Sequence, residues 1–182
     1  MNSFEQKEQT GESRQPATEE HGEEALTILR RSPVFKSASL EMVKLYAYLS
    51  RREEYEAGDI ILRQGGASDR LLLITSGKVA VTFTRGKVEL LLQELSADSL
   101  NYFGELALIC DTDWVFTAHA RSHVTLLSLS REAFRKVVER FPETYMETVE
   151  EIIKLRIQRY NSQAGYLIDR LGEDVLAKLA FR

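Results

Sequence analysis

A seven-residue segment in the middle of the chain combines residue types that could bind an anion. It reads Phe103-Gly104-Glu105-Leu106-Ala107-Leu108-Ile109, and its glutamate, leucines and alanine favour one or two turns of helix. A helix that begins at Gly104-Glu105 would direct its free N–H groups and positive dipole end at a buried anion. Gly104 would let the backbone approach closely, and the Glu105 carboxylate would accept a hydrogen bond from a ligand hydroxyl. The segment therefore predicts an anion-binding turn.

Short β-like runs surround this segment and must position it. Between Arg51 and Ser130 they read YEAGDIILR, RLLLITSG, KVAVTFT, KVELLLQEL, DWVFTAHA and HVTLLSLS, with glycines between several of them. Thr84-Arg85-Gly86-Lys87 is typical of a hairpin turn, since Gly86 can adopt a positive φ. Closely spaced short strands favour a sandwich or small barrel, and the strand–helix alternation of a Rossmann fold is absent from the sequence.

Helices are predicted on both sides of the strands. Residues 25–49 indicate two short helices with a break at Ser32-Pro33, and Ser39 is a suitable N-cap for the second. Ser130 is a suitable cap for a helix REAFRKVVER, and Pro142 begins a longer helix. The expected fold class is mainly β with flanking helices.

The segment 103–109 resembles the phosphate-binding cassette of the cyclic-nucleotide-binding domain family. In that family F-G-E-L-A-L is followed by a turn, an arginine, small residues and a strand. Gly58, Gly65 and Gly77 also fit the family's glycine framework, and the resemblance runs roughly from Val34 to Phe141. It implies a β-roll, or jelly-roll, barrel with a short cassette helix and a long C-terminal helix. It also implies a non-catalytic regulatory or sensor module, in which ligand moves the cassette relative to the C-terminal helix.

The C-terminal part is similar to the dimerisation helix and hinge of catabolite-activator-type regulators, which continue into a winged helix-turn-helix; we expect no room for one here. The expected domains are an acidic disordered arm at 1–24, the β-roll domain with its N-terminal helices at 25–141, and C-terminal dimerisation and hinge helices at 142–182. Residues 1–24 carry seven glutamates against two basic residues, a net charge of −5, whereas the remainder has a net charge of +1.

The sequence departs from the family at the residue that pairs with the phosphate. Where the family has its arginine, this chain has Trp114, and the small residues that follow are replaced by Val115 and Phe116. A charge-assisted hydrogen bond contributes about 1.5–3 kcal/mol, so its loss weakens binding about 10- to 150-fold. We therefore expect cyclic AMP and cyclic GMP to bind weakly or not at all in the usual manner.

Three explanations of this altered pocket remain open. The pocket is degenerate, or it takes a less anionic or more aromatic ligand stacked on Trp114, or another cation such as Arg121, Arg70 or His119 holds a phosphate. The predicted ligand-binding residues are those of the cassette and of the departing segment: Phe103, Gly104, Glu105, Leu106, Ala107, Trp114, Val115 and Phe116. No resident cofactor is expected beyond a cyclic nucleotide or another small-molecule ligand.

Apolar residues recur along the C-terminal helix at steps of three and four. They are Met146, Val149, Ile153, Ile157, Tyr160, Ala164, Leu167 and Leu171. This spacing is close to a coiled-coil repeat and favours a parallel homodimer seam over residues 146–171. A helix of about 30 residues is also longer than a barrel of this size can cover. The alternative is a helix packed on its own barrel. Six charged residues are expected on the polar outer surface of the helix: Glu147, Glu150, Glu151, Lys154, Arg156 and Arg159.

Composition and motifs exclude several other classes. A body with a net charge of +1 argues against nucleic-acid binding, and no apolar run approaches the ~20 residues of a membrane span. The single cysteine, Cys110, and the lack of a signal-peptide pattern favour a cytoplasmic location. His119 and His123 are interpreted as surface histidines rather than metal ligands, and no nucleophile–base motif indicates an enzyme. The rival function is a constitutive dimeric scaffold. Besides a second copy of the chain, the partner considered is an effector protein, to which a sensor would pass its signal.

Overall fold

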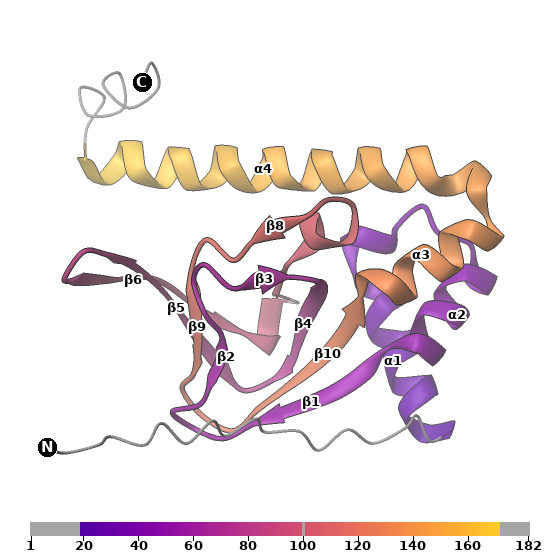
Figure 1. The fold of residues 1–182 in the computed structure, drawn as a ribbon, viewed down its shortest axis with the longest axis horizontal. Helices are drawn as coiled ribbons and strands as arrows, with labels where there is room; N and C mark the ends of the chain where they lie inside the picture. The colour runs from indigo at the N-terminus through magenta and orange to yellow at the C-terminus, as the bar shows by residue number, and fades with distance from the viewer. Residues whose placement is uncertain (1–18, 100, 172–182) are drawn as a thin grey trace, which may run out of the picture.

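The computed structural model describes residues 19–99 and 101–171 and shows a strand-built roll between two groups of helices (Figure 1). The helices are α1 (Glu19–Arg31), α2 (Leu40–Leu49), α3 (Arg131–Arg140) and α4 (Tyr145–Leu171), with short 3-10 helices η1 (Pro33–Phe35), η2 (Ala97–Ser99), η3 (Glu105–Leu108) and η4 (Pro142–Thr144). The strands are β1 (Arg51–Tyr55), β2 (Ile60–Leu62), β3 (Ala67–Ser68), β4 (Arg70–Ser76), β5 (Lys78–Arg85), β6 (Val88–Ser96), β7 (Tyr102–Phe103), β8 (Thr112–Asp113), β9 (Thr117–Ala120) and β10 (Val124–Ser130).

The strands form two antiparallel four-stranded sheets, ordered β1-β10-β4-β7 and β2-β9-β5-β6, and a small β3-β8 pair. Along β4 the side chains alternate between two apolar cores. Leu72 and Ile74 are buried inside the roll, whereas Leu71 and Leu73 are buried against the helices. The prediction of a mainly β roll with flanking helices is therefore confirmed.

Local signals in the sequence correctly marked several element boundaries. Gly86, with φ 64°, closes the β5–β6 hairpin. The side chains of Ser39 and Ser130 accept hydrogen bonds from the backbone N–H groups of Met42 (3.3 Å) and Ala133 (3.1 Å) and so cap α2 and α3. Short polar residues at these positions satisfy helix N–H groups that would otherwise lack a partner.

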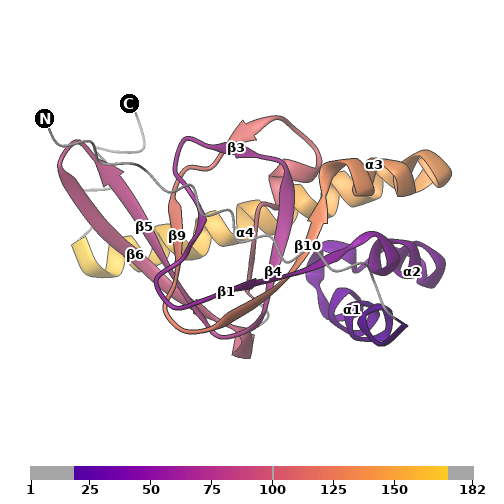
Figure 2. The same ribbon diagram turned by 60° about the horizontal axis from the view of Figure 1, so that its bottom comes forward.

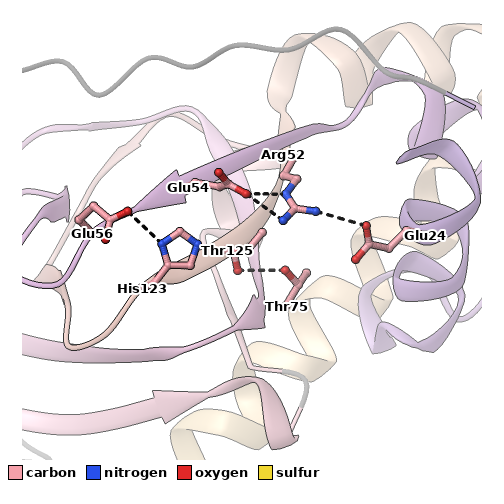
Figure 3. Close-up of polar contacts among 7 residues, drawn as sticks. All are labelled: Glu24, Arg52, Glu54, Glu56, Thr75, His123 and Thr125. Carbon is pink, nitrogen blue, oxygen red and sulfur yellow. Dashed lines mark hydrogen bonds and ion pairs between the residues drawn. The ribbon is translucent and has the colours of Figure 1, made fainter. Parts of the chain in front are cut away.

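The predicted acidic arm ends too late in the chain. Its last residues, Glu19 to Glu24, belong to α1, and residues 1–18 lie outside the described part. Figure 3 shows Glu24 directed at Arg52 of β1, with 3.7 Å between the carboxylate and the guanidinium, and Arg52 in turn paired with Glu54. The helix is anchored because Ala25 and Leu29, one turn apart, are buried in the helical core. The polar composition of residues 19–24 did not indicate a helix, since the apolar stripe begins only at residue 25.

Helix α4 runs along one side of the roll, opposite β1 (Figure 1). In the turned view, α1, α2 and α3 gather at one end of the molecule and the β5–β6 hairpin projects at the other (Figure 2). The first half of α4 is fixed to the helical core by Ile152, which is fully buried. Among the described helices, none is long and apolar enough to cross a membrane.

Candidate functional site

The predicted cassette forms a tight turn between β7 and β8. β7 pairs with β4, with Phe103 opposite Leu72, and the chain then turns at Gly104, whose φ is +86°. The 3-10 helix η3 follows, closed by a 3.0 Å hydrogen bond from the Ala107 N–H to the Gly104 carbonyl. The left-handed conformation at Gly104 is one that residues with side chains rarely adopt. The sequence thus correctly predicted a glycine-initiated helical turn within the strands.

Trp114 lies directly against this glycine. A Cβ atom placed on Gly104 would stand only 2.6 Å from Cη2 of the Trp114 ring, and Trp114 is buried to 8% exposure. The backbone holds the ring there, because Trp114 and the Gly65-Gly66 turn exchange hydrogen bonds at 2.8 Å and 2.7 Å. The indole therefore lies directly beside Gly104, where a side chain on that residue would meet it.

The residues around Trp114 form an aromatic cluster inside the roll. The rings of Phe103, Trp114 and Phe116 lie with their centroids 6.1–6.2 Å apart, two of the three pairs being edge-to-face. Val115 is 59% exposed and does not join them, whereas Leu106 packs on the helical core. Of the predicted ligand-binding residues, the structure thus brings Phe103, Gly104, Trp114 and Phe116 together and separates Val115 and Leu106 from this group.

The Glu105 carboxylate is almost entirely buried, and two arginines of α4 face it. Its side chain is 4% exposed, and its two oxygens lie 3.5 Å from Arg156 Nη1 and 3.7 Å from Arg159 Nη1. Arg159 also lies over the ring of Tyr102, 4.3 Å from its centroid. Burial raises the pKa of the Tyr102 hydroxyl, an effect that the nearby Arg159 opposes. A buried charge that would be costly alone is therefore compensated from another element.

The prediction that Arg156 and Arg159 belong to a polar outer surface of the helix is incomplete, because Arg156 is exposed and Arg159 half-buried, yet both face Glu105. They share the helix face of Ile152, three to four residues apart, and that face turns toward the roll. Ile152, Leu155 and Arg159 also lie on one face of the helix. This face was not predicted to contact the domain, because the apolar residues Ile153 and Ile157 follow the more regular spacing on another face.

A third arginine, which sequence reasoning did not identify, binds the far end of the cassette. Arg131, the first residue of α3, donates from Nη2 to the carbonyls of Ser68 (2.6 Å) and Cys110 (2.8 Å). It also contacts the Ala107 carbonyl through Nε and the Asp111 carboxylate through Nη1. No local signal marks this role, because the groups it joins lie 20 to 63 residues away in the sequence.

The three cations considered as substitutes for the family arginine have other partners. Arg70 Nε lies 3.6 Å from Glu53, and Arg121 Nε lies 3.9 Å from Glu94. His119 contacts Thr82 at 3.3 Å and lies 3.6 Å from Glu89. Their contacts therefore support none of them as the cation that holds a phosphate at Gly104.

The other histidine of the β region and the cysteine are surface residues. His123 pairs with Glu56 at 3.2 Å (Figure 3), and Cys110 is exposed with its thiol directed at the Leu106 carbonyl. Within residues 19–99 and 101–171, no group of three or more His, Cys, Asp or Glu side chains is arranged to hold a metal ion. The chemistry of the site therefore rests on the cassette, Trp114 and the arginines around them.

Comparison with known proteins supports the family resemblance. Residues 52–141 match the model of the cyclic nucleotide-binding domain family. The potassium/sodium hyperpolarization-activated cyclic nucleotide-gated channel 2 of Mus musculus is 26% identical over 149 residues, which are 81% of this chain and 16% of the channel. The chain thus spans about an eighth to a sixth of the length of the curated relatives it matches.

Solved structures agree with this assignment. The catabolite activator protein of Thermus thermophilus is 29% identical, with a TM-score of 0.60 over 77% of this chain and 63% of that protein. A cyclic nucleotide-binding domain from Methylobacillus flagellatus shares the fold, with a TM-score of 0.69 over 87% of this chain and 86% of that one at 21% identity. The fold is therefore that of a cyclic nucleotide-binding regulatory domain.

Proposed function

We propose that this chain, whose residues 52–141 match the model of the cyclic nucleotide-binding domain family, is a non-catalytic regulatory module whose altered pocket does not hold cyclic AMP or cyclic GMP in the family's usual manner. The proposal also assigns signal output to α4. One observation carries it, namely that the Trp114 ring occupies the space at Gly104. At this position the resemblance implies an arginine that would pair with the phosphate.

Displacing the indole would be unfavourable for a ligand. Trp114 is packed against Phe103 and Phe116, and removing such a buried ring from its contacts costs about 3–5 kcal/mol in typical cores. The missing guanidinium removes a further ~1.5–3 kcal/mol of charge-assisted hydrogen bonding. A dipole end of a short helix supplies about 0.3–1 kcal/mol and does not offset either loss. Both space and charge therefore oppose an anionic ligand here.

Titration calorimetry tests this proposal. The unmodified chain should give no saturable heat with cyclic AMP or cyclic GMP up to about 100 μM. At this concentration, binding about 100-fold weaker than that of a micromolar site would still be detected. Trp114→Arg should restore measurable binding, because it both empties the space and adds the cation. Trp114→Ala is the matched control, since it empties the same space without charge, and it should bind about 10- to 150-fold more weakly than Trp114→Arg. Micromolar binding by the unmodified chain would overturn the proposal.

We further propose that the partner is a second copy of the chain, bound through residues 146–171. The supporting observation is that most of the described part of the predicted seam is open to solvent, although Val149 is half-buried. Met146, Ile153, Ile157 and Tyr160 are 70%, 46%, 53% and 67% exposed, whereas Ile152 of the same helix is buried. Unpartnered apolar side chains at coiled-coil spacing favour association with another helix. The seam residues Ala164, Leu167 and Leu171 lie outside the described side chains.

Sedimentation velocity of the full chain checks this partner. We expect a species of twice the 20.8 kDa chain mass, and its conversion to monomer in Ile153→Glu/Ile157→Glu. Gln158→Glu is the matched control, because it adds charge to an exposed position of α4 outside the predicted seam. A monomer at every concentration, or a dimer that survives the double substitution, contradicts this interface.

The rival proposal is a constitutive scaffold, which the filled pocket also favours. A sensor gains thermal stability from its ligand in proportion to RT ln(1 + [L]/Kd), and a scaffold gains none. A melting-temperature screen of the unmodified chain with nucleotides and aromatic metabolites separates the two. A reproducible rise with any compound supports the sensor, and a flat screen supports the scaffold.

A further inference from the structure

Helix α4 is attached to the domain at two physically different points. Its first half is held by apolar packing, with Ile152 buried and Leu155 packed on the helical core. One turn later the contacts become ionic, where Arg156 and Arg159 face Glu105 of the cassette. The described side chains that follow, Tyr160, Asn161 and Ser162, are exposed. Among the described side chains, the two arginines are thus the last to tie α4 to the roll.

We propose that Glu105, Arg156 and Arg159 form a built-in latch that docks the distal half of α4 on the cassette. The inference rests on the proposed function only for its meaning as a signalling device, because the contact itself is made by the chain's own side chains. The cassette and α4 are then coupled by side chains of the chain itself. A cyclic nucleotide is not needed for this coupling, which is consistent with the proposed altered pocket.

The geometry favours a latch over an incidental surface pair. Glu105 is 4% exposed, so its charge is unsatisfied unless the arginines stay in place. Each carboxylate oxygen faces a different guanidinium, at 3.5 Å and 3.7 Å. Arg159 is also held from a second direction, because it lies over the Tyr102 ring at 4.3 Å. By contrast, Lys154 on the outer face pairs only with glutamates of its own helix.

The same contact restricts access to Glu105. A ligand hydroxyl that donates to this carboxylate, as the family resemblance implies for Glu105, would have to reach a group that is already faced by two cations and closed to solvent. A ligand and the docked helix would therefore compete for one acceptor. In this arrangement the undocked position of α4, rather than the docked one, would be the liganded state.

Amide hydrogen exchange on the full chain tests the latch. Glu105→Gln and Arg156→Gln/Arg159→Gln should each accelerate exchange of the backbone amides of residues 157–171 by at least about fivefold, since either change removes the ion pairs and allows that half to open. Combining all three substitutions should add little to either set alone, because both sets break the same contact. If Glu105→Gln fails to fold, the arginine variant remains informative, since those side chains are 44% and 29% exposed.

Lys154→Gln provides the matched control. It removes a cation and a pair with Glu150 from the same helix without touching the cassette, so it reports the effect of weakened helix stability alone. Exchange that is unchanged in both latch variants, or accelerated equally by Lys154→Gln, overturns the latch. Fully additive effects in the triple variant would do the same. None of these outcomes alters the calorimetric result with cyclic AMP, so the two proposals fail separately.

Discussion

Gly104→Ala should lower the free energy of unfolding by about 3 kcal/mol or more, as measured by urea denaturation followed by circular dichroism. A Cβ atom at this position would stand 2.2 Å from the backbone carbonyl oxygen of Arg70 and 2.6 Å from the Trp114 ring. The φ of +86° adds about 1–2 kcal/mol of strain for a residue with a side chain. Because one obstacle is backbone, a side-chain rearrangement does not relieve it.

Gly86→Ala separates the two contributions to this effect. Gly86 also has a positive φ, of 64°, but a Cβ atom there would meet nothing within 4 Å. Its substitution should therefore cost only the ~1–2 kcal/mol of backbone strain. An equal cost at Gly104 and Gly86 would refute the steric argument.

The Trp114→Ala background separates the ring from the backbone. There the indole contact is gone but the Arg70 carbonyl remains, so most of the cost of Gly104→Ala should persist. If Gly104→Ala becomes harmless in that background, the indole alone accounts for the crowding, and the close passage of β4 beside the cassette has no energetic role.

Arg131→Ala should destabilise the domain by about 3 kcal/mol and should loosen the cassette specifically. The substitution removes the donor for the carbonyls of Ser68, Ala107 and Cys110, which come from two different segments. Hydrogen bonds that involve a charged group contribute about 1.5–3 kcal/mol each, net of the bonds lost to water, and bonds made by one side chain do not add fully. The pair with Asp111 adds little, because that carboxylate is 92% exposed.

Two variants control for this prediction. Arg131→Lys keeps the charge but not the planar fork, so it should recover only part of the stability. Arg135→Ala, at an exposed position of the same helix, should change stability by no more than about 0.5 kcal/mol. Hydrogen exchange should accelerate around residues 104–112 in Arg131→Ala. A uniform change across the chain, or an effect as small as that of Arg135→Ala, contradicts the assignment of Arg131 as the cassette's clamp.

Together these contacts hold the cassette from three sides. β4 and Trp114 confine Gly104, α3 holds the carbonyl end through Arg131, and α4 faces Glu105 through Arg156 and Arg159. Each set of contacts comes from a different element, so the position of the cassette depends on the positions of β4, α3 and α4. This arrangement suits a module that responds to movements of its helices, whether a ligand or a partner causes them.

Patterns along the chain were sufficient to predict the fold class and the turn at the cassette. The useful signals were the alternation in the strands, the hairpin at Gly86 and the serine caps. Each acts within a few residues, where backbone preference and local hydrogen bonds determine the conformation. The replacement of the expected cation by Trp114 could also be recognised from the sequence, because it depends only on the residue type at one position.

The groups that meet around the cassette come from distant elements, and their pairing could not be predicted from the sequence. Arg131 joins groups up to 63 positions away, and Arg156 and Arg159 face Glu105 because α4 folds back along the roll. The apolar pattern of α4 indicated two faces without showing which one the domain would cover. Ile152 settled that choice, since burying it turns the arginines inward and the Ile153 stripe outward. Such pairings depend on how elements pack, and helical period alone does not encode them.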